Sequence, residues 1–169
     1  MRPSTYDVKS GGLWIAPAKG SGVGYVLEHW GLDGTLRQRL VRDVPWLPVT
    51  GYPDEPMAPD FKFLDVDSNG LLWVLVAVKD PDWRKRRGNT GTDASDDEQG
   101  DLRLEVLDPR AEEVLASIRI DSVSRYVPPV FPVGRGRRKA YDVVEDGSGI
   151  VRLNIHDLFL VEKSGRGRD

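Results

Sequence analysis

Residues 61–78 read FKFLDVDSNGLLWVLVAV and predict two strands joined by one tight turn. The run 71–78 is almost entirely apolar, which is typical of a strand covered on both faces. Residues 61–66 form the other apolar segment, and the Asp, Ser, Asn and Gly at 67–70 have the composition of a turn. We therefore interpret this stretch as an antiparallel strand pair, which the rest of the chain repeats and extends.

The arrangement occurs three times along the chain. The strings Tyr6-Asp7-Val8, Leu64-Asp65-Val66 and Tyr141-Asp142-Val143 each lead into a glycine-bearing turn and then an apolar strand. The two intervals between these strings agree once a polar insert at residues 84–101 is left out of the second interval. Such a repeat decides the fold, because a single unit buries its apolar face only against a neighbouring unit.

The three units form one predicted region over residues 1–162. Their approximate bounds are 4–43, 60–121 and 138–162. The insert 84–101 in the second unit is charged and contains glycines, a composition that predicts a solvated, mobile loop. Residues 163–169 continue from the third unit as a flexible tail.

Each unit is predicted to be an antiparallel meander of short strands. Asp33-Gly34 supplies a tight turn in the first unit, because Gly readily takes positive φ, and Asp108-Pro109 opens a hairpin turn in the second. His156-Asp157 predicts a break between the two strands of the third unit. After the leading strings, the predicted strands are 13–16, 25–30, 35–41, 71–78, 102–107, 113–120, 150–155 and 158–161.

Residues 43–60 separate the first two units and contain five prolines. Proline lacks a backbone donor and has a fixed φ, so a regular strand or helix is excluded here. We predict an ordered crossing between two meanders that packs through Trp46, Leu47 and Tyr52.

The composition indicates an all-β globular protein. Of 169 residues, 39% are hydrophobic and 30% charged, and the 18 glycines and 12 prolines lie mostly between apolar runs. The sequence contains no apolar run approaching the roughly 20 residues of a membrane span. The net charge of −3 argues against nucleic acid as a partner. The localisation stays open, because no secretory signal is visible at residues 1–7 and the absence of cysteine fits either redox compartment.

The second unit resembles the blades of six-bladed β-propellers, such as the NHL-repeat and SMP-30/gluconolactonase-like groups. The matching residues are Asp65, Asp67, Gly70, Leu72, Trp73 and Val74, followed by Leu104-Glu105-Val106-Leu107-Asp108-Pro109. The first unit keeps Gly12-Leu13-Trp14-Ile15 and Asp33-Gly34, whereas the third keeps Asp142 and a glycine turn without a tryptophan. The resemblance covers most of the chain.

This resemblance implies structural roles for the residues that recur. The acids are expected to bond turn amides and hold the register of each sheet, and the tryptophans are expected in the core between adjacent sheets. Lactonase-like members hold a divalent cation with a Glu, an Asn and an Asp, but this triad does not map onto the chain. The residues of the structural repeat are Asp7, Trp14, Asp65, Asp67, Gly70, Trp73 and Asp142.

About three blades do not close a ring, since propellers have typically four to eight. Three explanations stay open. The chain is the C-terminal part of a longer six-bladed propeller, or two chains close one ring as a homodimer, or the meanders form an open sheet or sandwich. We favour the first explanation, a partial β-propeller of antiparallel four-stranded meanders.

Several polar groups are candidates for a site, and each is expected to have an ordinary structural or solvated role. His29 and His156 are the only histidines, and neither has a second histidine at metal-ligand spacing. The acidic stretch 93–101 lacks the alternate acidic positions of a calcium loop. The basic clusters 84–87 and 135–139 have no interleaved aromatic side chains, so they predict a charged surface and no site for nucleic acid.

The sequence therefore predicts an architecture and a broad class of function, with no catalytic, metal or cofactor-binding residue assigned. The favoured interpretation is a binding module or scaffold whose loops, at one end of the channel, hold a protein or small-molecule ligand. A metal-dependent lactonase or esterase is the alternative. A fragment without independent activity is the third interpretation.

Overall fold

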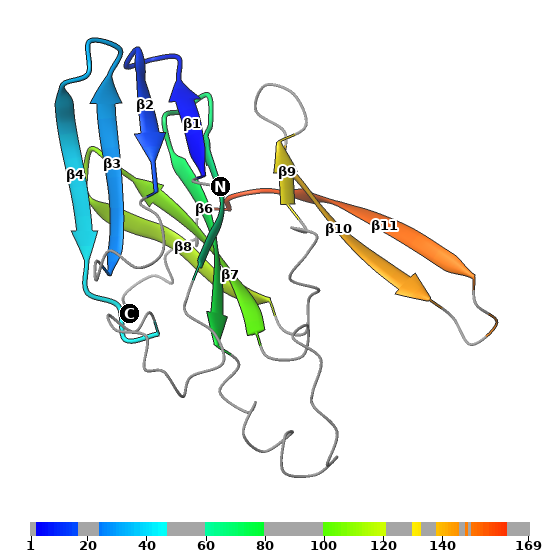
Figure 1. Cartoon of the computed structure of the whole chain (residues 1–169). Helices are drawn as coiled ribbons and strands as arrows, with labels where there is room; N and C mark the ends of the chain where they lie inside the picture. Colours follow the sequence, from blue (N-terminus) through cyan, green and yellow to red (C-terminus); the bar gives the residue numbers. More distant parts are fainter. Residues whose placement is uncertain are drawn as a thin grey trace, which may run out of the picture. The chain divides into compact units, whose positions relative to one another are not determined.

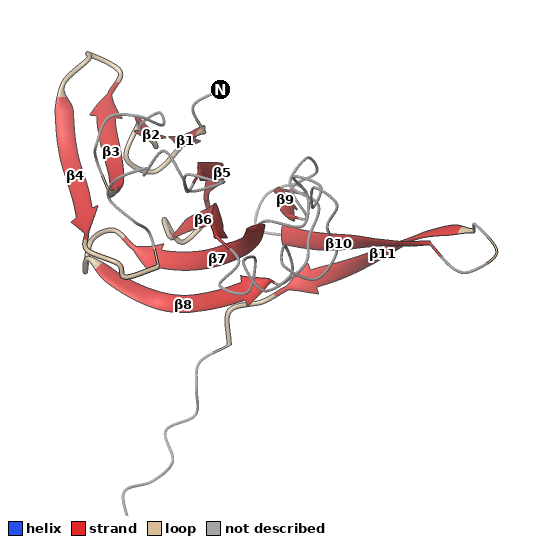
Figure 2. Ribbon diagram, turned by 60° about the horizontal axis from the view of Figure 1, so that its bottom comes forward, coloured by secondary structure: helices blue, strands red, loops and turns tan. Residues whose placement is uncertain are grey.

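Every regular element in the described part of the chain is a β-strand, which confirms the all-β prediction (Figure 2). The computed structural model describes residues 3–16, 24–46, 60–79, 100–120, 130–132, 138–145, 148 and 150–161. Within these ranges, no helix has the length and apolar character needed to cross a membrane. The chain divides into two compact units, Met1–Pro128 and Pro129–Asp169, which we treat separately.

The first four strands form an antiparallel meander that we call sheet A (Figure 1). They are β1 (Ser4–Asp7), β2 (Gly12–Ile15), β3 (Tyr25–Gly31) and β4 (Leu36–Arg42), and they pair in this order. Gly34 lies in the β3–β4 turn with a φ of 80°, a conformation that costs glycine little because it has no Cβ. The predicted strands and tight turn of the first unit are confirmed.

The next four strands form a second antiparallel meander, sheet B, and confirm the predicted second unit. They are β5 (Asp60–Val66), β6 (Leu72–Lys79), β7 (Gly100–Asp108) and β8 (Glu113–Ile120). β7 begins at Gly100, so the last two residues of the predicted mobile insert 84–101 belong to a strand. Asp101 is only 2% exposed, and Arg119 Nε of β8 donates to its carboxylate at 2.9 Å. This cross-strand pair allows an acid to occupy a buried strand position, and residues 84–99 lie outside the described ranges.

One face of sheet A packs against one face of sheet B and closes a hydrophobic core. Side chains alternate between the two faces of a strand, so every second residue of β2, β3 and β6 contributes. Fully burying one such side chain stabilises the fold by about 1.5–3 kcal/mol. The side chains at the centre of this core are at most 2% exposed: Trp14, Tyr25, Leu27, Leu72, Val74 and Val76.

The proline-rich crossing is described as far as Trp46. Its indole is half-buried against the core and meets the Tyr25 ring edge-on, with the centroids 5.9 Å apart. Tyr25 in turn meets Phe61 edge-on at 5.2 Å. Edge-to-face contacts are a favoured aromatic geometry, so Trp46 packs the start of the crossing as predicted. Leu47 and Tyr52 lie outside the described residues.

The two tryptophans of the repeat define which residues of the two sheets are equivalent. Trp14 is paired with Thr5 on β1, and Trp73 is paired with Asp65 on β5. Thr5 and Asp65 therefore occupy equivalent places on the first strand of each sheet. These two residues also touch, because the Thr5 hydroxyl donates to the Asp65 carboxylate at 3.3 Å.

The same register shows that the leading strings were aligned wrongly by two residues. Asp7 is paired with Gly12 at the end of β1, and the equivalent acid in the second unit is Asp67, not Asp65. The cause is a difference in turn length. The chain reaches Trp14 seven residues after Asp7, but it reaches Trp73 six residues after Asp67.

The second unit of the chain contains a three-stranded antiparallel sheet in the order β11-β10-β9. These strands are β9 (Val130–Pro132), which the sequence did not indicate, β10 (Arg138–Glu145) and β11 (Val151–Leu158). Asp142 lies in the middle of β10 opposite Asn154, whereas the corresponding strings of sheets A and B lie on edge strands. The third unit therefore does not repeat the order of the first two.

The predicted break at His156-Asp157 is wrong. Both residues lie inside β11, in continuous register with β10, and β11 ends at Leu158, so the predicted strand 158–161 is absent from the described residues. Asp157 is tolerated in the strand because Lys139, directly opposite, places its Nζ 2.8 Å from the Asp157 carboxylate.

Candidate functional site

The antiparallel order of the two meanders places alternate turns of each sheet at the same end. In sheet A, these are the β1–β2 turn (8–11) and the β3–β4 turn (32–35). In sheet B, they are the β5–β6 turn (67–71) and the β7–β8 turn (109–112). We call these four turns the turn platform.

Side-chain bonds to the backbone link three of the four turns through β4, the strand that follows directly on the fourth turn. Arg37 of β4 donates to the Ser10 carbonyl at 2.7 Å, and Gln38 donates to the Pro109 carbonyl at 2.6 Å. Arg110 donates to the Asn69 carbonyl at 3.1 Å. The links run from the β1–β2 turn through β4 to the β7–β8 turn and on to the β5–β6 turn. These bonds fix the turns of the platform to strand β4 and to one another.

Each turn of the platform has an aspartate at or next to its start that accepts a backbone N–H. Asp67 Oδ1 accepts the amides of Asn69 and Leu71 at 2.8 and 2.9 Å, and its Oδ2 accepts the Trp73 indole N–H at 3.1 Å. The sequence repeat suggested both Asp65 and Asp67 for this role. Asp67 has it, whereas the Asp65 carboxylate accepts a hydrogen bond from the Thr5 hydroxyl. The turn acids are Asp7, Asp33, Asp67 and Asp108, the second and fourth of which the repeat did not single out.

Hydrogen bonds in three of these turns lower the pKa of the turn aspartate. A hydrogen bond from the Thr35 hydroxyl is the main cause of the lowered pKa of Asp33, and one from the Arg110 amide is the main cause of the lowered pKa of Asp108. Burial by itself would raise the pKa of Asp7. Hydrogen bonds from the side chain and amide of Ser10 and from the Lys9 amide outweigh this effect and lower the pKa below 3.8. These three turns are therefore stabilised by the charged form of Asp7, Asp33 and Asp108.

The most elaborate contact at the platform joins Asp7, Ser10 and His29. The Ser10 hydroxyl lies 2.6 Å from Asp7 Oδ2 and 2.9 Å from His29 Nε2. The His29 ring stacks on Trp14 with centroids 4.8 Å apart and an angle of 18° between the planes. A Cβ at Gly12 would lie 2.4 Å from His29 Nε2, so only glycine fits beneath the ring.

These three side chains are the types found in nucleophilic hydrolases, but their order is different. The Ser10 hydroxyl donates a charge-assisted hydrogen bond of 2.6 Å to the ionised Asp7, so its proton is already engaged and His29 Nε2 must be the donor to Ser10. A catalytic histidine has to accept the serine proton instead. The cluster therefore clamps the β1–β2 turn to β3, and His29, which is 6% exposed, has the structural role that the sequence predicted.

The burial of His29 in this cluster of Asp7, Ser10 and His29 predicts that the stability of the fold depends on pH. Burial lowers the pKa of His29 below 6.5; the Asp7 charge opposes this effect and the Arg37 charge adds to it. A base with a lowered pKa in the folded state contributes stability above its unfolded pKa and loses it as the pH falls. We expect the free energy of unfolding in urea to decrease as the pH falls through and below 6.5.

The control for this measurement is the other histidine, His156 on the exposed strand β11. His29→Gln should remove this pH-dependent part between about pH 5 and pH 7, a range above the titration of Asp7, while His156→Gln should keep it. An NMR titration that placed the pKa of His29 above 6.5 would contradict the prediction.

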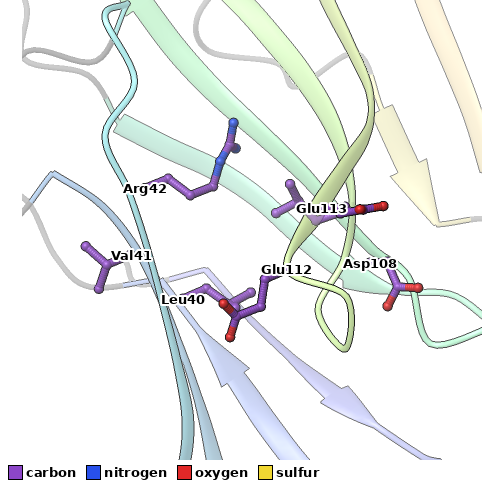
Figure 3. A pocket seen from close by; sticks show the side chains of 7 residues that line it. Leu40, Val41, Arg42, Asp108, Glu112 and Glu113 are labelled. Atoms are coloured by element: carbon purple, nitrogen blue, oxygen red, sulfur yellow. The ribbon is translucent and has the colours of Figure 1, made fainter.

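A shallow cavity of about 80 Å³ lies between β4 and the β7–β8 hairpin, beside the platform (Figure 3). Leu40 and Leu107 form a buried apolar floor, at 6% and 3% exposed. Glu112 extends from the hairpin towards β4, whereas the carboxylates of Asp108 and Glu113 point away from β4 in this view. A water molecule occupies about 30 Å³ of liquid, so the cavity admits a small chemical group and no drug-sized ligand.

A network of charged side chains crosses between the outer strands of the two sheets. Arg42 of β4 donates to Glu105 of β7 at 2.5 Å, and the Ser117 hydroxyl donates to the other Glu105 oxygen at 3.0 Å. Arg103 donates to Ser117 at 2.8 Å. Glu105 is only 1% exposed, so these partners must replace the water that its carboxylate loses on burial.

Tyr25 lies next to this network, and its buried hydroxyl, beside Glu105 and Arg42, makes no hydrogen bond of normal geometry to the described residues. Burial and the nearby Glu105 charge raise the pKa of Tyr25 well above 10, so the hydroxyl stays protonated. Leaving such a group unsatisfied costs about 1–3 kcal/mol. We expect Tyr25→Phe to raise the free energy of unfolding by about 1 kcal/mol in urea denaturation. A loss of stability in this variant would show that the hydroxyl has a partner in solution.

Two of the remaining predicted residues belong to the second unit of the chain. His156 faces solvent on β11, and Asp142 lies within β10. The acidic stretch is described only at its end, where Gly100 and Asp101 belong to β7. Among the described residues, no group of three or more His, Asp or Glu side chains is placed to hold a metal ion.

Comparison of the chain with known proteins identified no relative. No model of a known protein family matches the chain, and no curated protein or solved structure is significantly similar to it. The function is therefore inferred from the fold and from the residues of the platform.

Proposed function

We propose that this chain is a β-propeller-type binding module, part of a six-bladed ring, which holds a protein or small-molecule ligand on the turn platform. The observation that carries the proposal is the stacking of two equivalent meanders. Sheets A and B pack face to face, and the equivalent residues Thr5 and Asp65 touch across their first strands. Blades of a propeller are four-stranded sheets stacked around an axis, so neighbouring first strands are what this architecture requires.

The platform has the properties of a surface that binds another molecule. Its turns are tied together by Arg37, Gln38 and Arg110, and loops on a rigid scaffold commonly carry binding residues. Two turns also present large apolar side chains to water, since Val8 is 78% exposed and Leu32 is 68% exposed. A ligand that covers these side chains would remove apolar surface from water.

A thermal-shift screen of small molecules and peptides, followed by calorimetry of each hit, tests the proposal. Ligands of the platform should raise the melting temperature of the wild-type chain and fail to bind the double variant Val8→Asp/Leu32→Asp. Ile118→Asp is the matched control, because Ile118 is an exposed apolar residue of β8 outside the platform, at 58% exposure. Hits that bind all three proteins equally would refute the platform as the binding site.

The same preparation tests the hydrolase alternative. Hydrolysis of a lactone or an aryl ester that depends on added calcium or zinc would replace the binding proposal with a metal-dependent enzyme. Because the Ser10 hydroxyl is engaged by Asp7, we expect any such activity to survive Ser10→Ala.

A further inference from the structure

The face of sheet A that points away from the core carries apolar side chains on all four strands. Three of these side chains are largely exposed: Tyr6 at 48%, Leu36 at 46% and Val41 at 67%. The others are half-buried, and Val26 on the same face is fully buried. A contiguous exposed apolar patch marks an interaction surface. We call this patch the outer face; its members are Tyr6, Leu13, Ile15, Trp30, Leu36 and Val41.

A single ion pair lies among these apolar side chains. Glu28 of β3 and Arg39 of β4 are directly opposite in the sheet, and Arg39 Nε lies 3.5 Å from the Glu28 carboxylate. The Trp30 indole donates to Glu28 at 3.1 Å and fixes the position of this carboxylate. The Arg39 side chain is 49% exposed and that of Glu28 is 24% exposed, so both groups are accessible to another partner.

A surface with adjacent positive and negative groups is complementary to itself. When two copies meet about a two-fold axis, the order of the pair is reversed in the second copy, so Glu28 of each lies opposite Arg39 of the other. The surrounding apolar side chains are buried by the same contact, and the surface carries no net charge that would repel a copy. A partner with a net charge of either sign gains no comparable match.

We infer that the outer face of sheet A binds the outer face of a second copy of this chain, in a two-fold symmetric dimer. The inference concerns the outer face and not the turn platform, and it applies to the chain by itself, because the next blade of a ring would cover the outer face. It also differs from closure of a ring by two chains, which joins unlike surfaces head to tail.

Light scattering coupled to gel filtration, on the full chain at micromolar concentration, tests the inference. The wild type should have twice the chain mass of 18.9 kDa. Glu28→Arg and Arg39→Glu should each be monomeric, because like charges then face each other across the two-fold axis. An equimolar mixture of these two variants should recover the dimer, since each supplies the charges that the other lacks.

Further variants separate the dimer from loss of folding and from failure of the binding proposal. Val41→Glu should be monomeric with an unchanged circular dichroism spectrum, while Ile118→Glu and Val8→Asp/Leu32→Asp should remain dimeric. A monomeric wild type, or single charge variants that stay dimeric, would overturn the inference. A dimer whose mixed charge variants do not recover it indicates head-to-tail association and also rejects the two-fold interface.

Discussion

Replacing Trp14 with alanine is expected to lower the free energy of unfolding by about 3–5 kcal/mol. The indole is 2% exposed, lies in the core between the sheets and stacks on His29. Alanine removes this buried area and leaves a cavity that a sheet pair with fixed strand spacing closes only in part. Urea denaturation followed by circular dichroism measures the change.

The chain supplies controls for this substitution. Trp14→Phe keeps an aromatic ring on His29 and should lose substantially less stability than alanine. Val8→Ala removes an apolar group that is 78% exposed and should change stability by no more than about 0.5 kcal/mol. Equal losses for Trp14→Ala and Val8→Ala would mean that Trp14 is not part of the packed core.

Replacing Arg42 with leucine should cost about 3–5 kcal/mol, because it leaves the Glu105 carboxylate buried without its cation. Glu105 is 1% exposed and, within the described residues, would keep the uncharged Ser117 hydroxyl as a donor. The guanidinium also lies 4.6 Å above the Tyr25 ring centre, so that contact is lost as well.

The double variant Arg42→Leu/Glu105→Leu separates the loss of a partner from the loss of packing. Replacing a buried ion pair with apolar side chains is often close to neutral, so the double variant should regain most of the stability lost by Arg42→Leu. If the loss in free energy of unfolding in the double variant equalled the sum of the losses in the two single variants, this account would be contradicted. The thermodynamic cycle gives the coupling energy of the pair directly.

The strands of sheets A and B were predictable because each is a short apolar run bounded by turn residues. The chain around Asp33-Gly34 and Asp108-Pro109 has local turn chemistry, which acts over a few residues and can be read from them. The errors arose where the structure depends on a partner strand. Asp157 and Asp101 are acids that loop composition explains equally well, and only Lys139 and Arg119 across the sheet make them strand residues.

The repeat showed the same limit of local information. Matching the letters of the strings made Asp7 and Asp65 equivalent, but the pairing of Trp14 and Trp73 makes Asp7 equivalent to Asp67. The clamp of His29 was hidden for a related reason. Ser10 lies in a turn and His29 in a strand 19 positions later, and only the pairing of β2 with β3 brings them together. The inward position of His29, in phase with Tyr25 and Leu27, was the one available signal.

The contact between Thr5 and Asp65 constrains how a chain of this kind can be duplicated. If neighbouring units were identical, two aspartates would face each other about 3 Å apart, and their repulsion would force one of them to bind a proton. Threonine at one of the two places supplies a donor to the other. Tandem copies that carry aspartate at this position must therefore diverge there once they stack. An artificial array built from a single meander would have to carry a hydroxyl here in every unit, since a hydroxyl both donates and accepts, or alternate a hydroxyl and a carboxylate along its axis.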